Sequence, residues 1–314
     1  MSKQFIADLK DKSIVSSQFM VYKKQIRDFK NKPGKYLTFI IADKTGQMEA
    51  KVWDKAEEFA ARFKEEDIVL LEGRVESFND KLQLKVANLH KVDEYDIGDF
   101  LHKTSKDVDK LFNYIKSVNI KNRYLKSLLD SFLNDQEFSS LFKNAPAAKS
   151  LHHCYLGGLV EHTYEVIKIC EVVCELFPQI DRELLFTGAI LHDIGKIAEL
   201  KFTKVIDYTD EGRLIGHVVM GERIVSKRMD TIEGFPKEIK IRMSHLLLSH
   251  HGEYVWGSPK RPKTLEACAL HYAENLDAQV NRFIQIIERG KDKTWADYDK
   301  LLERHIYIGE QMEE

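Results

Sequence analysis

The sequence predicts a two-domain α+β protein, with a small β-barrel over residues 1–92 followed by an all-helical bundle. Two changes in pattern along the chain support this division. Between about residues 13 and 92, apolar and polar residues alternate over short segments, which is the period of β-strands. After residue 92, apolar residues recur at steps of three and four, which is the period of helices. With 314 residues, the chain is long enough to bury a core in each domain.

The composition is that of an ordinary globular protein, with 43% apolar and 31% charged residues. No segment approaches the roughly 18 uncharged apolar residues of a membrane span, and the N-terminus lacks the apolar core of a secretory signal. We therefore expect a cytoplasmic protein without membrane contact. The net charge of −2 argues against a protein that binds nucleic acid by overall charge alone.

The charge is nevertheless unevenly distributed. Residues 1–92 contain 18 Lys and Arg against 14 Asp and Glu, which gives this part a net charge of +4. Six cations lie between residues 23 and 35, with only Asp28 as an acid among them: Lys23, Lys24, Arg27, Lys30, Lys32 and Lys35. Such a stretch is typical of segments that contact phosphates, although a solvated lysine-rich loop would have the same sequence.

Five strands are expected in the first domain. The strand patterns cover residues 36–42, 47–53, 68–75 and 82–86, after a first strand that begins near residue 13, and a helical piece covers residues 55–64. A turn signal, Asp43-Lys-Thr-Gly46, joins the second strand to the third. Five short strands with a helix between the third and fourth predict a small closed barrel of the OB type.

Three segments of this domain, DKTGQMEAKVWD, VLLEGRV and KLQLKVANL, resemble the nucleic-acid-binding OB module of aminoacyl-tRNA synthetases and DNA polymerase subunits. The resemblance implies that single strands bind across strands 2 and 3 and their flanking loops. The alternation turns Leu37, Phe39 and Ile41 inward. The binding candidates are Tyr36, Lys51 and Trp53 on the outer face, with Phe78 and Lys81 in the last hairpin loop. Each aromatic among them could instead belong to the core.

The helical half is expected to consist of a helical linker region at residues 93–149, a bundle at residues 150–292 and a tail at residues 293–314. The linker region carries an apolar stripe at helical spacing: Leu111, Tyr114, Ile115, Leu125, Leu128, Leu129 and Phe132.

Adjacent His192 and Asp193 end an apolar helix, and Gly195 then breaks that helix. Neighbouring side chains on a helix splay by about 100°, so this pair can converge on one metal only near a helix end. A neutral imidazole and an ionised carboxylate suit Mn, Fe or Zn, and the two carboxylate oxygens can bridge two ions.

Further candidate ligands lie on separate helices of the same bundle. His162 falls on a buried apolar stripe, His217 begins an amphipathic helix, and His250-His251 precede a glycine stop. Glu274 and Asp277 follow, one helical turn apart. A single buried histidine is usually a hydrogen-bonded core residue. The ordered set, however, indicates a metal cluster of the kind that helical bundles build from inward side chains.

This ordered set resembles the HD superfamily of metal-dependent phosphohydrolases over about residues 150–290, and specifically its two-metal members. The resemblance implies a first metal held by His162, His192, Asp193 and a late acid. It implies a second metal held by His217, His250 and His251, with Asp193 bridging the two. The late acid departs from the family pattern, because Glu274 stands where the family has Asp. Either Glu274 reaches the metal, or Asp277 replaces it, or the first metal binds more loosely.

The OB module followed by PAAKSLHHCYLGGLVEHT, GAILHDIGK, HLLLSHHGEYVWGSP and HYAENLDAQVN resembles the YhaM-type 3′→5′ exoribonucleases of Firmicutes along nearly the whole chain. This implies two divalent ions, Mn²⁺ first and Fe²⁺ or Co²⁺ as alternatives. It also implies release of nucleoside 5′-monophosphates from single-stranded RNA, with DNA as a further substrate. We separately expect a homo-oligomer. The competing interpretations are a nucleotide or cyclic-dinucleotide phosphohydrolase and a non-catalytic RNA-binding module.

For an exonuclease, Asp193 and Lys196 are the expected catalytic residues, with Lys196 facing the scissile phosphate. Lys196 could alternatively be an exposed lysine at a helix end. Lys149, His152 and His153 either hold the terminal nucleotide or orient metal ligands. Trp256 either stacks on the terminal base or plugs the loop that contains it.

Overall fold

The computed structural model of the chain describes residues 3–29, 31–79, 81–149, 153–203, 205–290 and 293–309. The chain divides into two compact units. The first unit comprises the chain up to His102 together with the stretch Thr203–Val205, and the second comprises the rest. The first unit thus runs past residue 92, where the sequence places the end of the barrel. The helices that the sequence places in a linker region pack into the core of the second unit.

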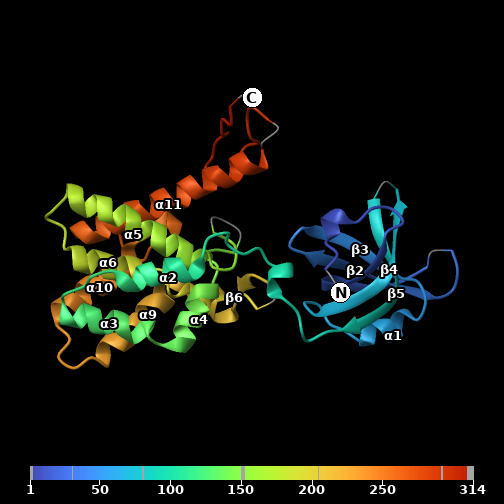
Figure 1. Cartoon of the computed structure of the whole chain (residues 1–314), viewed down its shortest axis with the longest axis horizontal. Helices are drawn as coiled ribbons and strands as arrows, with labels where there is room; N and C mark the ends of the chain where they lie inside the picture. Colours follow the sequence, from blue (N-terminus) through green and yellow to red (C-terminus); the bar gives the residue numbers. More distant parts are fainter. Residues whose placement is uncertain are drawn as a thin grey trace. The chain divides into compact units, whose positions relative to one another are not determined.

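The first unit is a closed five-stranded barrel (Figure 1). Its elements are η1 (Ile6–Asp8), β1 (Ile14–Asp28), β2 (Lys35–Asp43), β3 (Gly46–Val52), α1 (Ala56–Ala61), β4 (Ile68–Phe78), β5 (Lys81–Lys91) and η2 (Ile97–Asp99). The strands close in the order β1-β2-β3-β5-β4, with β3 and β5 parallel and the other pairs antiparallel. The prediction of an OB-type barrel with a helix between the third and fourth strands is confirmed.

The inward face of β2 explains why the barrel closes. Leu37, Phe39 and Ile41 are at most 1% exposed, and they share an apolar core with Phe19 of β1 and Leu71 of β4. Burying one side chain of this size contributes about 1.5–3 kcal/mol. A slip of one residue in register would turn these side chains toward solvent, so their burial fixes how β2 pairs with its neighbours.

The second unit is a helical bundle with one short two-stranded ribbon. Its helices are α2 (Val108–Ser117), α3 (Arg123–Leu133), α4 (Gln136–Asn144), α5 (Gly158–Leu176), α6 (Arg182–Leu191), α7 (Lys196–Glu199), α8 (Asp210–Ile215), α9 (His217–Asp230), α10 (Lys237–Ser249), η3 (Tyr254–Trp256) and α11 (Leu265–Arg289). The ribbon pairs β6 (Leu200–Lys201) with β7 (Asp207–Tyr208). The predicted all-helical bundle is confirmed, with the ribbon as a small addition.

Local sequence fixes where the long helices begin. The side chains of Asp107, Asn122, Asp135, Asp181 and Thr264 each accept a hydrogen bond from a first-turn amide of the helix that follows. The bundle core is continuous through α3, α5, α6, α9, α10 and α11. These helices surround a polar centre that is described below.

The end of α11 carries a small satellite core. Ile286 packs there with Ala296, Leu302 and Ile306 of the segment that follows the helix. Figure 1 shows α11 extending from the bundle to this segment near the C-terminus. Among the described residues, no helix is long and apolar enough to cross a bilayer.

Candidate functional site

His192 and Asp193 lie in a tight turn between two helices. The α6 helix ends at Leu191, His192 caps it, and α7 starts at Lys196. A Cβ atom on Gly195 would lie 2.0 Å from the carbonyl oxygen of His217. Only glycine therefore lets this turn approach the start of α9 so closely. The close approach brings His217 to Asp193.

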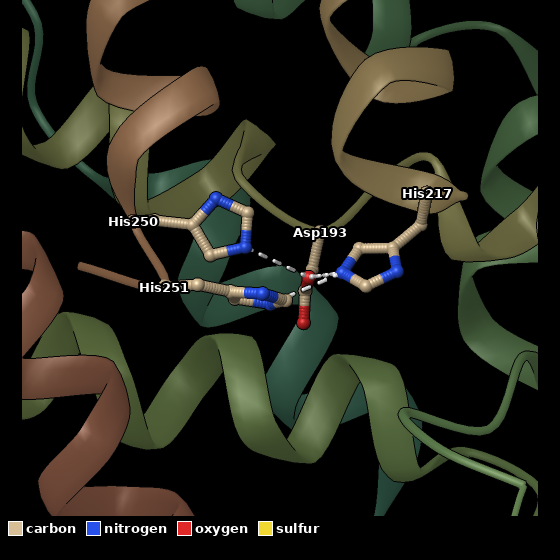
Figure 2. A group of neighbouring side chains, drawn as sticks. All are labelled: Asp193, His217, His250 and His251. Carbon is tan, nitrogen blue, oxygen red and sulfur yellow. Dashed lines mark hydrogen bonds and ion pairs between the residues drawn. The ribbon is translucent and has the colours of Figure 1, made fainter. Parts of the chain in front are cut away.

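Four side chains from three parts of the chain surround one point in the bundle. Figure 2 shows the imidazoles of His217, His250 and His251 directed at the carboxylate of Asp193. Each of the four offers a ligand atom, and these atoms all lie within 4.8 Å of one another. His162, His192 and Asp193 form a second such group. Asp193 belongs to both of these groups, and His153, His162 and Asp277 form a third group.

The two carboxylate oxygens of Asp193 face different histidines. Oδ2 lies 3.5 Å from Nε2 of His162 and 3.4 Å from Nε2 of His192. Oδ1 lies 3.5 Å from Nε2 of His217 and 3.6 Å from Nε2 of His250. The Nε2 atom of His251 lies 3.3 Å from that of His217. One carboxylate thus separates two sets of imidazoles.

All five imidazoles direct Nε2 toward the Asp193 carboxylate, because the Nδ1 atom on the opposite side of each ring makes a hydrogen bond. The Nδ1 contacts are His162 to Asp277 at 2.6 Å, His192 to the Ala189 carbonyl at 2.9 Å, His217 to Glu199 at 3.0 Å, His250 to the Leu247 carbonyl at 2.7 Å and His251 to the Trp256 carbonyl at 3.1 Å. Each of these partners is an acceptor, so in the neutral form of each ring the proton lies on Nδ1 and Nε2 carries a lone pair. This is the tautomer that binds a metal through Nε2.

These residues fit a divalent cation. The Nε2 atoms of His162 and His192 lie 3.2 Å apart, and when both neutral rings carry their proton on Nδ1, the two lone pairs repel unless a cation lies between or beside them. Asp193 Oδ1 and His250 Nε2 are buried, and neither makes a hydrogen bond within the described residues. Leaving such atoms unpaired is costly, and coordination to a metal would satisfy both. The nitrogen and oxygen donors suit Mn, Fe, Co or Zn.

The protonation states of His250, His251 and Asp193 agree with a metal centre. Burial lowers the pKa of His250 to about 4 and of His251 to about 2, with their neighbouring imidazoles adding to the effect, so both are neutral at neutral pH. Burial alone would raise the pKa of Asp193, but Lys196 and His192 outweigh it and hold that pKa well below its usual range. Burial would lower the pKa of His192, but the charge of Asp193 outweighs burial and raises it, which favours a proton on this ring that a metal at Nε2 would have to displace. The cluster therefore attracts positive charge at its Asp193 oxygens.

Lys196 lies within the cluster. Its Nζ atom is 2.5 Å from Asp193 Oδ2, and the residue is 7% exposed. The alternative of an exposed lysine at a helix end is wrong, because the ammonium is buried against the carboxylate.

The two late acids occupy different positions. Asp277 Oδ2 accepts a hydrogen bond from Nδ1 of His162, on the side of the ring opposite Asp193. Burial and, after it, the negative charge of Asp193 raise the pKa of Glu274 to about 7. The charge of His192 acts on Glu274 in the opposite direction. Asp277 thus contacts His162, and the pKa of Glu274 is coupled to the charges of Asp193 and His192.

The residues before α5 divide between the interior and the surface. His153 is fully buried, bonds the hydroxyl of Tyr155 at 2.8 Å and lies 3.3 Å from Asp277. Burial would lower its pKa, but Asp277 and Glu165 raise it to about 9. The His153 ring therefore contacts Asp277 in the interior and does not reach solvent. Lys149 pairs with Asp207 at 2.7 Å. His152 lies outside the described residues.

The loop after His251 is exposed on its apolar side. Tyr254, Val255 and Trp256 in η3 are 62%, 88% and 52% exposed. The Trp256 ring therefore does not plug the loop, while its carbonyl oxygen holds His251. A half-exposed indole thus lies in the segment that fixes a candidate ligand.

Glu199 belongs to this site and was missed from the sequence. Its Oε1 atom accepts from both the backbone amide and Nδ1 of His217, at 2.9 and 3.0 Å. The signal that could have identified it is an acid at a buried position in the apolar run Ile197-Ala-Glu-Leu200, because buried acids are nearly always paired.

The barrel carries a stripe of aromatic rings and cations on its outer face. The rings of Tyr36 and Trp53 stack at 5.2 Å, and Phe29 lies 5.3 Å from Tyr36. Lys51 Nζ lies 5.7 Å from the Trp53 ring and 5.8 Å from the ring of Phe78. The sequence-based candidates Tyr36, Lys51, Trp53 and Phe78 are therefore contiguous.

The remaining members of this region lie at its ends. Lys81, at the start of β5, is exposed. Phe29 was missed because it follows β1 in a segment without strand alternation, and Lys32 lies 4.2 Å over its ring.

The two units match known protein families. Residues 159–279 match the HD domain, and residues 20–92 match an OB-fold nucleic-acid-binding domain of the tRNA anticodon-binding type. The chain is 34% identical over 281 residues to the 3′-5′ exoribonuclease YhaM of Geobacillus sp. (strain WCH70), covering 87% of this chain and 85% of the relative. It is 32% identical over 297 residues to the 3′-5′ exoribonuclease YhaM of Bacillus subtilis (strain 168), covering 92% and 93%.

Among solved structures, the second OB-fold domain of replication protein A from Methanococcus maripaludis is 20% identical. It matches 30% of this chain and 98% of its own length, with a TM-score of 0.25. A TM-score this low supports no inference.

Proposed function

The chain belongs to the YhaM family of 3′-5′ exoribonucleases, and from this premise we propose that it hydrolyses single-stranded RNA from the 3′ end at a centre of two divalent metals. The released product is a nucleoside 5′-monophosphate. The observation that carries the proposal is the placement of Asp193, whose two oxygens each face a separate set of imidazoles. A carboxylate between two sets of neutral nitrogen donors is the arrangement that bridges two cations.

The residues divide between two ions. His162, His192 and Oδ2 of Asp193 would hold the first, with Glu274 as the late acid. The second ion would be held by His217, His250, His251 and Oδ1 of Asp193. Mn²⁺ is our first choice, and Fe²⁺ and Co²⁺ suit the same donors. When bound, such a pair supplies a water of lowered pKa and neutralises charge on the phosphodiester oxygens.

The residues of the chain supply the rest of the chemistry. Asp193 is ionised at neutral pH because its pKa is held low, so no proton need leave the carboxylate before it binds cations. Lys196 brings a buried positive charge to the same place, where it would stabilise the growing negative charge of the phosphate. Trp256, whose carbonyl oxygen bonds His251, presents a half-exposed indole that is suited to stacking on the terminal base.

The barrel would hold the upstream part of the substrate. Its stripe of Phe29, Tyr36, Trp53 and Phe78 with Lys51 offers ring faces to bases and cations to phosphates. Stacking uses the face that every base presents, whatever its identity or sugar. This surface therefore suits RNA and also single-stranded DNA.

We also propose that the chain forms a homo-oligomer through α11. Leu276, Val280, Ile284 and Ile287 are 53%, 47%, 47% and 37% exposed and recur at steps of three and four. An apolar stripe of this kind on a helix typically packs against another helix. Native mass spectrometry of the wild-type chain and of Leu276→Glu tests this, and a monomer in both would contradict it.

The experiment that tests the proposed activity uses end-labelled substrates. Purified protein with Mn²⁺ should convert 5′-labelled single-stranded RNA into a ladder of shortening products. On 3′-labelled RNA it should release a labelled mononucleotide from the start. Turnover of free nucleotides or cyclic dinucleotides, without degradation of either RNA, would replace the proposal with a nucleotide phosphohydrolase.

A further inference from the structure

We infer that Glu199 is a positioning residue of the metal centre, whose carboxylate orients His217 and thereby sets the affinity of one metal subsite independently of the other. The inference rests on the proposed two-metal function and deepens it. Glu199 Oε1 accepts the amide proton of His217 at 2.9 Å and the Nδ1 proton at 3.0 Å. Both bonds act on one residue, so they fix its backbone and its ring together.

Contacts to the backbone of Glu199 fix the position of this residue. It is the last residue of α7, and its backbone oxygen accepts a hydrogen bond from the amide of Thr209 at 2.8 Å. A Cβ atom on Gly212 would lie 2.2 Å from that same oxygen, so α8 packs directly against it. The Glu199 residue is 8% exposed. The packing of α7 and α8 therefore fixes the backbone of Glu199, and its two hydrogen bonds to His217 orient that ring before any ligand arrives.

The opposite side of the centre has its own carboxylate. Asp277 Oδ2 accepts from Nδ1 of His162 at 2.6 Å, and Asp277 Oδ1 accepts from Asn281 at 3.0 Å. His192, His250 and His251 bond main-chain carbonyls instead. A carboxylate raises the basicity of a ligating imidazole and fixes its orientation. Each set of imidazoles thus contains one ring held by an acid.

The two acids act on different oxygens of the bridge. Glu199 controls His217, which faces Oδ1 of Asp193, whereas Asp277 controls His162, which faces Oδ2. Within the described part of the chain, no hydrogen bond or ion pair joins Glu199 to Asp277. Loss of one carboxylate should therefore weaken one ion and leave the other bound. We expect Glu199→Gln to weaken one ion by about 10–100-fold, and Asp277→Asn to weaken the other by a similar factor.

The test is metal binding by the full-length protein, without turnover. The chelator-stripped wild type, Glu199→Gln and Asp277→Asn are titrated with Mn²⁺ and followed by calorimetry and by electron paramagnetic resonance. The wild type should bind two ions and show the coupled signal of a pair. Each variant should keep one tight ion and show the uncoupled signal of a single Mn²⁺ at partial loading. Glu211→Gln, an exposed acid on the adjacent helix α8, is the matched control and should bind like the wild type.

A double-mutant comparison separates positioning from a general loss of structure. In a His217→Ala background, Glu199→Gln should have little further effect on Mn²⁺ affinity, whereas Asp277→Asn should still weaken the remaining ion. Glu199→Asp, which keeps the charge, should recover part of the affinity that Glu199→Gln loses.

The outcomes distinguish the two claims. A wild type with two ions and a Glu199→Gln variant with unchanged affinities would overturn the positioning role and leave the proposed function standing. Equal weakening of both ions in Glu199→Gln would also overturn it. A wild type that binds less than one ion would contradict the two-metal function itself, and the inference with it.

Discussion

Asp193 Oδ1 lies 3.6 Å from Nε2 of His250, and both atoms are buried without a hydrogen bond in the described part of the chain. Two acceptors left facing each other inside a helical bundle are costly in free energy. The fold nevertheless retains them, and it also directs four further Nε2 atoms to the same place. A bound pair of cations would resolve this cost.

Asp193→Asn should abolish hydrolysis while RNA binding changes by no more than a few-fold. The substitution keeps the size of the side chain but removes the charge between the two sets of imidazoles. We expect a loss of activity of about a thousandfold or more. End-labelled RNA degradation and fluorescence anisotropy measure the two properties separately. If binding collapses together with activity, the barrel is not the main RNA contact.

Lys196→Met should lower kcat by about a hundredfold with a small change in KM. The ammonium is buried against Asp193, where it would meet charge that develops on the phosphate in the transition state. Because Met retains most of the side-chain volume, the packing should survive. Steady-state kinetics on a short oligonucleotide give both constants. A rise in KM at constant kcat would assign Lys196 to ground-state binding instead.

Gly195→Ala should destabilise the helical unit and weaken metal binding. The added methyl group would lie 2.0 Å from the His217 carbonyl oxygen, which is a backbone atom and cannot rotate away. We expect a cost of about 1–3 kcal/mol or more. Thermal unfolding measures it, with Gly46→Ala as the control. A Cβ on Gly46 would meet only Ile6 at 3.5 Å, an ordinary contact. Equal stability of the two variants would show that α7 and α9 tolerate separation.

Trp53→Ala combined with Lys51→Ala should weaken binding of long single-stranded RNA and reduce its dependence on salt. The double variant removes a stacking ring and a cation from the same stripe, at about 1–3 kcal/mol for the stacking alone. Cleavage of di- and trinucleotides should be unaffected, because these do not need the barrel. Anisotropy at several salt concentrations checks the prediction, and unchanged affinity would remove this face as the RNA site.

Phe29→Ala provides a separate test of the same stripe. Phe29 lies beside both Tyr36 and Trp53, with Lys32 over its ring. Its loss should weaken binding of long RNA without changing the fold of the barrel, because Phe29 lies outside the barrel core. Circular dichroism provides the control for folding. An affinity equal to that of the wild type would show that the RNA-binding surface does not extend beyond Tyr36 to Phe29.

The sequence predicted the barrel because its strands alternate, and it predicted the group of candidate ligands because they stand in motifs at helix ends. It could not identify the groups behind the ligands. The partners of His192 and His250 are main-chain carbonyls of the preceding turn, which any residue supplies. Glu199 and Asp277 meet their histidines only through tertiary packing.

The two late acids illustrate the same limit. Glu274 and Asp277 are one turn apart on α11, so their spacing in the sequence does not show which of them would bind a metal. Their positions are distinguished only when the position of His162 is known, because Asp277 contacts the Nδ1 atom of His162. Sequence likewise gave no reason to expect that the carbonyl of Trp256 would hold His251.

The most direct measurement of the central claim is the number of metal ions per chain. Full-length protein reconstituted with Mn²⁺ and dialysed should contain two ions per chain by elemental analysis, and Asp193→Asn should contain at most one. Chelation should abolish RNA degradation, and added Mn²⁺ should restore it. A wild-type chain that retains less than one ion, or an Asp193→Asn variant that retains two, would contradict the proposal that this carboxylate bridges a metal pair.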